Sequence, residues 1–242
     1  MKKWNLLNEA VTSDRKKISL WERDEEYTIR VNGADLMTTR QHTSEDKLGE
    51  IGCAHLRAVK NPRILIGGLG FGYTLKSVLL RVSPTARITV AELMPSIITW
   101  NRSPAYPFAA VAMADRRVQT VQRDVLSVIR ASRAKFDSIL LDIDNGPSAL
   151  SAEGNDSLYR EAGLLQIKQA LRPGGLVAVW SVSDSPGFMK ALGKAGFRAE
   201  AVPVRAHISS GGTRIIFVGR LAQKEKDSRN PVSRSAPKSS RR

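Results

Sequence analysis

The chain has 242 residues, 42% of them hydrophobic, and a formal net charge of +15. This length and composition predict one large globular domain, or one domain with a small appendage, and the lack of an apolar run near ~18 residues argues against a membrane protein. Cys53 is the single cysteine and the three histidines lack a metal-binding spacing, so we expect neither a disulfide nor a bound metal. No apolar segment follows Lys2 and Lys3, so we expect a cytoplasmic protein.

The C-terminal segment accounts for part of the positive charge. Residues 220–242 contain eight lysines and arginines against two acidic residues, with many serines and few apolar residues. This composition predicts a disordered basic tail over 221–242. Because no aromatic residue is interleaved for base stacking, the tail is more typical of a solubilising segment than of a nucleic-acid-binding arm. Nucleic acid is therefore a secondary candidate partner.

Residues 1–60 predict a small β-meander followed by a helix. The segments 18–23 and 27–31 alternate apolar and polar residues, and Asn32-Gly33 is a strong turn signal. Residues 44–56 have helical periodicity, and Ser44 can cap the start of that helix.

Residues 61–220 alternate between strands and helices. The expected strands are 63–66, 86–92, 117–122, 136–142 and 176–181, and the expected helices are 73–82, 96–101, 125–132, 155–171 and 186–195. A pair of strands at 198–204 and 213–219 closes the domain. The pattern predicts an α/β fold: a Rossmann-like, doubly wound, mostly parallel sheet with helices on both faces. Ligands of such sheets bind at the carboxyl ends of the strands, where we expect the site.

A glycine-rich turn follows the first of these strands. Gly68, Gly70 and Gly72 have the spacing Gly-x-Gly-x-Gly, one residue shorter than the dinucleotide fingerprint. The shorter spacing favours a nucleotide without a pyrophosphate. Glu92 ends the next strand 20 residues after Gly72, where a carboxylate can accept both ribose hydroxyls. The alternative is an acid that caps the following helix.

Three further acidic residues follow strand ends. Asp124 is placed to accept a hydrogen bond from an adenine amino group, to cap the next helix, or to do both. Asp142 ends the fourth strand beside the expected donor, and Asp144 enters the loop where an acceptor amine would lie. Both are candidate catalytic residues, because a carboxylate can orient an ammonium or take its proton. The alternative for Asp144 is a simple turn. Trp180, at the end of the fifth strand, is expected to pack in the core, and the alternative is that it faces the acceptor.

Together these motifs resemble the spermidine synthase (polyamine aminopropyltransferase) branch of the class I S-adenosylmethionine-dependent methyltransferase superfamily. The resemblance covers residues 63–219 and includes the glycine turn, Glu92, Asp124, and the Asp-x-Asp-x-Gly-Pro run from Asp142. It also includes Ser157-Leu-Tyr-Arg-Glu and Leu171-Arg-Pro-Gly-Gly-Leu, and the leading meander is similar to that family's small N-terminal domain. The resemblance implies an S-adenosylmethionine-type donor, a small-molecule amine acceptor and a homodimer.

Two family features are absent. The glycine loop of aminopropyltransferases carries an aspartate for the donor's aminopropyl amine, where this chain has only Leu69 and Phe71, and their meander carries a Tyr-Gln pair for the polyamine. The sequence therefore favours methyl transfer from S-adenosylmethionine to a small-molecule amine or another nitrogen or oxygen nucleophile. The alternative is a polyamine aminopropyltransferase that uses decarboxylated S-adenosylmethionine. Further alternatives are an RNA-associated methyltransferase and a non-catalytic nucleotide-binding module.

Overall fold

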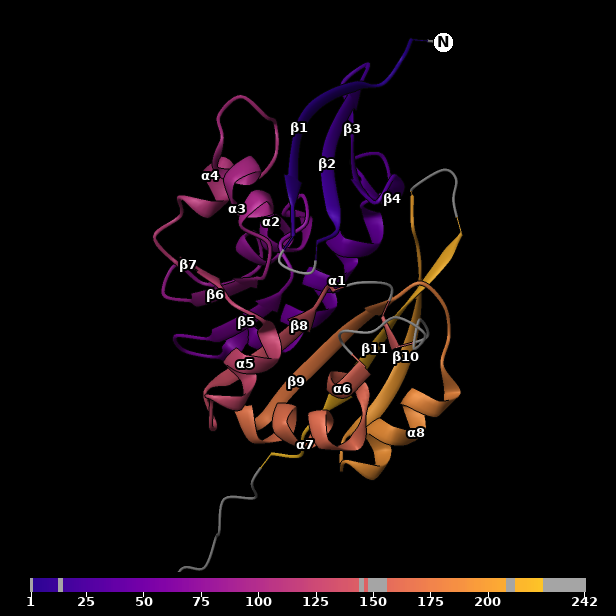
Figure 1. Cartoon of the computed structure of the whole chain (residues 1–242). Helices are drawn as coiled ribbons and strands as arrows, with labels where there is room; N and C mark the ends of the chain where they lie inside the picture. Colours follow the sequence, from indigo (N-terminus) through magenta and orange to yellow (C-terminus); the bar gives the residue numbers. More distant parts are fainter. Residues whose placement is uncertain (1, 13–14, 144–145, 148–155, 208–211, 224–242) are drawn as a thin grey trace, which may run out of the picture.

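The computed structural model describes residues 2–12, 15–143, 146–147, 156–207 and 212–223. Its elements form two sheets, one of four strands and one of seven, shown in Figure 1.

The N-terminal sheet is an antiparallel meander with the order β1-β2-β3-β4. Its strands are β1 (Asn5–Val11), β2 (Lys17–Arg23), β3 (Glu26–Val31) and β4 (Ala34–Thr38). Asn32 and Gly33 have φ values of 49° and 83°, so the predicted turn joins β3 to β4 in the left-handed region that Asn-Gly hairpins use. The sequence did not predict β1 and β4. Almost all of β1 is exposed, so it lacks the apolar alternation of a half-buried strand.

The larger sheet confirms the predicted Rossmann-like architecture. Its strand order is β10-β11-β9-β8-β5-β6-β7. Strands β9, β8, β5, β6 and β7 pair in parallel, whereas β11 pairs antiparallel with both β9 and β10. The bounds are β5 (Arg63–Gly67), β6 (Arg87–Glu92), β7 (Val118–Gln122), β8 (Phe136–Leu141), β9 (Leu171–Ser181), β10 (Arg198–Arg205) and β11 (Thr213–Arg220).

Helices cover both faces of this sheet because neighbouring residues of a strand point to opposite sides. In β5, Ile64 and Ile66 belong to one buried cluster and Leu65 belongs to the other. The first cluster joins the meander and the helices α1 (Thr43–Cys53), α2 (Tyr73–Leu79), α3 (Pro95–Arg102) and α4 (Ala110–Met113). The second joins α5 (Val125–Arg130), α6 (Asp156–Tyr159), α7 (Glu161–Ala170) and α8 (Pro186–Lys194). A short 3-10 helix, η1 (Ala54–Ala58), follows α1.

Three local expectations were wrong. The helix expected over 155–171 is divided at Arg160 into α6 and α7, and the bend brings Gly163 so close to Leu158 that an added Cβ would lie 2.3 Å from its carbonyl oxygen. The Arg-Pro-Gly-Gly segment belongs to the start of β9. Ser44 does not cap α1 either, because the helix begins one residue earlier, at Thr43, and its N-cap residue is His42.

The strand order creates a switch point beside β5. The chain runs from β5 to β6 and β7 on one side, and then returns to place β8 on the other side of β5. Gly67, at the end of β5, pairs with Ala91 of β6 and with Leu141 of β8. The carboxyl ends of these strands therefore meet at the crevice where ligands of such sheets bind. The meander stands at this end of the molecule, with α1 below it in Figure 1.

Candidate active site

The glycine turn at the end of β5 has a backbone that only glycine adopts readily. Gly68, Gly70 and Gly72 have φ values of 86°, 51° and 76°. A Cβ at Gly68 would lie 2.1 Å from the backbone oxygen of Asp142, and one at Gly72 would lie 2.4 Å from the Cβ of Ala109. The turn therefore packs directly against the end of β8 and against α4.

Glu92 holds the turn in place from the end of β6. Its carboxylate accepts a hydrogen bond of 2.8 Å from the backbone N–H of Leu69 and another of 2.8 Å from that of Met94. Glu92 is 8% exposed and lines a cavity. The bond to Met94, the N-cap residue of α3, shows the structural role that the sequence left as an alternative. Carboxylate oxygens can each accept more than one hydrogen bond, so a ribose hydroxyl can still bind here.

Asp124 also has a visible structural role. Its two carboxylate oxygens accept hydrogen bonds from Leu126 N at 3.1 Å and Ser127 N at 3.3 Å, and so cap α5. Asp124 lines the same cavity as Glu92. The capping role is present, and contact with an adenine amino group stays a prediction.

The cavity has a volume of about 440 Å³, within the usual ~300–1,000 Å³ of small-ligand pockets. It lies at the carboxyl ends of β5, β6 and β8, and β4 of the meander forms another wall. Met37 of β4 lies beside the glycine turn, since a Cβ at Gly70 would come within 2.7 Å of its Cε. Met37 thus fills the space into which a side chain at position 70 would extend. Other apolar lining residues are Leu36, Leu93, Met94, Ile97, Val125, Ile143 and Val182.

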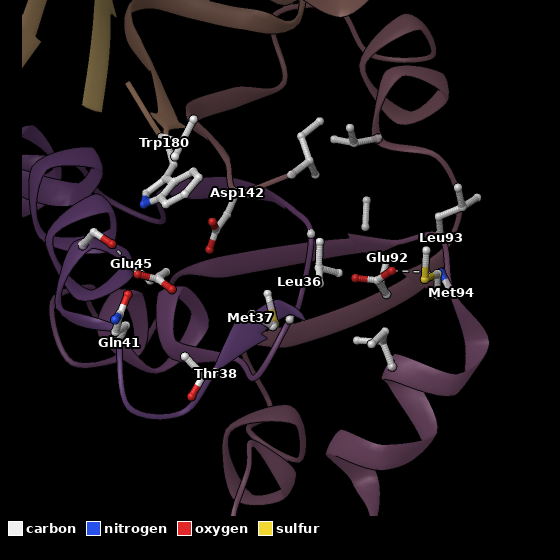
Figure 2. Close-up of a pocket in the computed structure, with 18 of the residues that line it drawn as sticks. Leu36, Met37, Thr38, Gln41, Glu45, Glu92, Leu93, Met94, Asp142 and Trp180 are labelled. Carbon is white, nitrogen blue, oxygen red and sulfur yellow. Dashed lines mark hydrogen bonds between the residues drawn. The ribbon is translucent and has the colours of Figure 1, made fainter. Parts of the chain in front are cut away.

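The two ends of the cavity differ in chemistry. Figure 2 shows Glu92 and Met94 at one end, and Asp142, Glu45 and Trp180 at the other. The Oδ2 atom of Asp142 accepts a hydrogen bond of 2.6 Å from the hydroxyl of Thr74 on α2. Glu45, in the first turn of α1, accepts one of 2.5 Å from the neighbouring Ser44 hydroxyl. A second carboxylate therefore joins Asp142 from a part of the chain 97 positions earlier.

Both carboxyl groups hold their protons more tightly than usual. Burial raises the pKa of Asp142 from 3.8 to about 6, although the hydrogen bond from Thr74 opposes the rise. Burial and, next, the negative charge of Asp142 raise the pKa of Glu45 from 4.5 to about 8. Like charges in a poorly hydrated site disfavour joint ionisation, so a cation bound between the two carboxylates would stabilise their charged forms.

The structure brings the predicted donor residues to one cavity and adds residues that sequence reasoning missed. Gly68, Gly70, Glu92, Asp124 and Asp142 all line it, and Gly72 ends the turn. Asp144 lies outside the described residues. Glu45, Gln41, Thr74 and Arg214 were not predicted. The only signal at Glu45 was an acid in the first turn of a helix, which is an ordinary feature of helices.

Trp180 packs against the core, as expected, and also lines the cavity. The Gly146-Pro147 pair of the loop after β8 lies next to it. A Cβ at Gly146, where φ is 76°, would come within 2.4 Å of the Trp180 backbone oxygen.

Within the described ranges, no three or more His, Cys, Asp or Glu side chains are grouped so that they could hold a metal ion. None of the helices in those ranges is long and apolar enough to cross a membrane.

Comparison with known proteins identifies the fold. No protein-family model and no curated protein sequence matches the chain. Among solved structures, a spermidine synthase from Thermotoga maritima has a TM-score of 0.66 at 17% identity, over 89% of this chain and 72% of that one. A spermidine synthase in complex with the transition-state analogue AdoDATO gives the same values.

A probable spermidine synthase from Corynebacterium glutamicum has a TM-score of 0.61 at 17% identity, over 91% of this chain and 81% of that one. Both sheets of the present structure are needed to reach such coverage. The chain therefore has the fold of the spermidine synthases.

Proposed function

We propose that this protein is an aminopropyltransferase-like enzyme that transfers an alkyl group from an S-adenosylmethionine-type donor to an amine. The observation that carries the proposal is the pair Glu45 and Asp142, which lies in the same cavity as the glycine turn and Glu92. One end of the cavity suits a nucleoside, and the other suits an ammonium group. The structural similarity to spermidine synthases supports the same assignment.

In this proposal, the nucleoside of the donor lies along the glycine turn. Glu92 accepts from the ribose hydroxyls, Asp124 accepts from the adenine amino group, and Leu93 and Met94 supply apolar contact. The sulfonium then lies near Asp142, at the carboxyl end of β8. A sulfonium is already an activated leaving group, so the protein has to align the reactants and exclude water rather than supply a strong base.

Glu45 offsets the main argument against aminopropyl transfer, which is the missing aspartate in the glycine turn. The glycine turn has no aspartate for the donor's terminal ammonium, and Met37 fills the space beside Gly70. Glu45 supplies a carboxylate to the same cavity from α1. We therefore assign the donor's ammonium to Glu45. Asp142 is assigned the acceptor amine, whose proton it can receive when the new C–N bond forms and the C–S bond breaks.

Methyl transfer from ordinary S-adenosylmethionine is the second candidate. The observation that favours it is Arg214, a cation in the cavity wall that could bind the carboxylate of the donor's methionine. Residues 224–242, on which the RNA-associated alternative depends, lie outside the described part of the chain. Residue-level donor contacts stay predictions in both cases.

Calorimetric titration with both donors separates the candidates. The decarboxylated donor should bind more tightly than ordinary S-adenosylmethionine, and turnover should release 5′-methylthioadenosine. Tighter binding of ordinary S-adenosylmethionine, with release of S-adenosylhomocysteine, would show a methyltransferase. If neither donor binds to the full chain, the whole proposal fails.

A further inference from the structure

Arg214 places a cation in the wall of the cavity. It lies near the start of β11, is half-buried, and lines the cavity with Asp142 and Trp180. Its Cζ lies 5.9 Å from the centroid of the Trp180 ring, and its Nη1 donates a 3.4 Å hydrogen bond to the Thr213 backbone oxygen. Among the residues that the structure describes, no carboxylate forms an ion pair with Arg214.

Groups of both signs are therefore arranged around one indole. Figure 2 shows Asp142 beside Trp180, with Glu45 nearby on α1, and the guanidinium of Arg214 lies over the same indole. Arginine presents a rigid planar fork of donors that matches a carboxylate with two parallel hydrogen bonds. An acceptor whose only charged group is an ammonium would leave the guanidinium of Arg214 without a charged partner.

We propose that the acceptor is a small aminocarboxylate, whose amine binds at Asp142 and whose carboxylate binds Arg214. This inference rests on the proposed alkyl-transferase function and narrows its acceptor class. The cavity of about 440 Å³ also has to hold the donor, which favours a short acceptor.

A polyamine fits this end of the cavity less well. Its second ammonium would lie against the guanidinium of Arg214, and like charges repel most where the site excludes water. An aminocarboxylate replaces that repulsion with a charge-assisted hydrogen bond. The structure thus predicts discrimination between two acceptors of equal chain length that differ only in the terminal group.

The test compares 4-aminobutanoate with 1,4-diaminobutane as acceptors for the full-length protein, with each donor in turn. We expect kcat/KM for 4-aminobutanoate to exceed that for 1,4-diaminobutane by about tenfold or more. R214Q should lower the value for 4-aminobutanoate by about 10- to 100-fold and raise that for 1,4-diaminobutane, because it removes the charge that repels the second ammonium. R220Q is the matched control, because Arg220 is on the same strand, is also half-buried and lies outside the cavity wall.

Calorimetry on the same variants keeps the inference separate from the proposed function. If the protein binds a donor but neither turns over 4-aminobutanoate nor binds it in the presence of the nucleoside product, the inference fails and the donor assignment stands. A preference for 1,4-diaminobutane, or an equal loss for both acceptors in R214Q, would also overturn it. If R214Q instead weakens only ordinary S-adenosylmethionine, Arg214 binds the donor's carboxylate and the inference is wrong. If no donor binds, the proposed function itself fails.

Discussion

At the residue scale, the acids of the site combine structural and candidate chemical roles. Glu92 is bonded to the backbone of the glycine turn and of α3, and Asp124 caps α5. The sequence framed these as alternatives to ligand binding. The two kinds of role are compatible, because a carboxylate fixed by one or two backbone N–H groups is already oriented for a ligand and has acceptor capacity left. A conservative substitution therefore disturbs both roles together.

Replacing Glu92 with Gln should weaken donor binding by about 1–3 kcal/mol, since charge-assisted hydrogen bonds to the ribose become neutral ones. Calorimetry with the decarboxylated donor measures this effect. The matched control is Glu50→Gln, because Glu50 is on α1 and pairs with Lys47 and Arg81. Equal affinities for Glu92→Gln and Glu50→Gln would remove Glu92 from the donor site.

Donor affinity should also depend on pH through the two carboxyl groups. Ionised carboxylates attract the donor's ammonium, so affinity for the decarboxylated donor should rise as pH passes about 6 and about 8, the pKa values of Asp142 and Glu45. Glu45→Gln removes the carboxyl with the higher pKa. We expect that variant to lose the rise in donor affinity near pH 8 and to keep the rise near pH 6. An unchanged pH profile would separate Glu45 from the donor.

At the scale of elements, the site depends on how closely the glycine turn approaches its neighbours. The turn lies between β5, β8 and α4, and its conformation was predictable from the glycine spacing. The residues that the turn packs against were not predictable from the sequence. The spacing of glycines specifies a local backbone shape, whereas contact with Asp142 and Met37 depends on elements from other parts of the chain.

Gly68→Ala is expected to reduce the free energy of unfolding by about 3 kcal/mol or more. The added Cβ would combine a left-handed φ of 86° with a contact of 2.1 Å to the Asp142 backbone oxygen. Gly33→Ala is the control, because Gly33 has a similar φ of 83° but no heavy atom within 4 Å of the added Cβ. That control should lose only about 1–2 kcal/mol. Urea unfolding distinguishes the two, and equal losses would contradict a crowded turn.

At the scale of the whole molecule, the cavity requires the meander and the large sheet together. Met37 and Thr38 of β4 and Glu45 of α1 form one side, while the strand ends of the large sheet form the other. The two carboxyls at this junction, Glu45 and Asp142, bind protons more tightly in the folded state than such groups ordinarily do, because folding buries them. Folding therefore affects how many protons the chain binds.

The stability of the ligand-free protein should fall as pH rises. The folded pKa values of Asp142 and Glu45, about 6 and about 8, exceed the unfolded values, so the folded state binds more protons between pH ~4 and ~8. Stability is then greatest below the unfolded pKa values and is lost as pH passes the folded ones. We expect a loss of at least about 1 kcal/mol, or about 2–4 °C in Tm.

Thermal unfolding of the wild type and of the double variant Glu45→Gln, Asp142→Asn measures this effect. The double variant should have a flatter dependence of Tm on pH over the same range. A Tm of the wild type that rises from pH ~5 to ~8, by contrast, would show that the pair does not retain its protons.

The sequence by itself determined the alternation of strands and helices, the glycine turn and the acids at the strand ends. These features are local: a period of two or 3.6 residues, a glycine where φ must be positive, and a carboxylate at a strand terminus. They were sufficient for the Rossmann-like fold and for one end of the cavity. They failed where a segment lacks its own pattern, as in the exposed β1 and at the bend between α6 and α7.

Only the tertiary structure decided the other end of the cavity. Glu45 looked like an ordinary acid at the start of a helix, and Arg214 like one basic residue among many. Folding brings both to the cavity that Asp142 lines, because α1 packs across β8 and β9 while β11 pairs beside β9. Burial then changes the chemistry of the acids by raising the pKa of each. Neither the proximity nor the desolvation is encoded within any short stretch of sequence, so motifs predicted the glycine turn, Glu92, Asp124 and Asp142 but not Glu45 or Arg214.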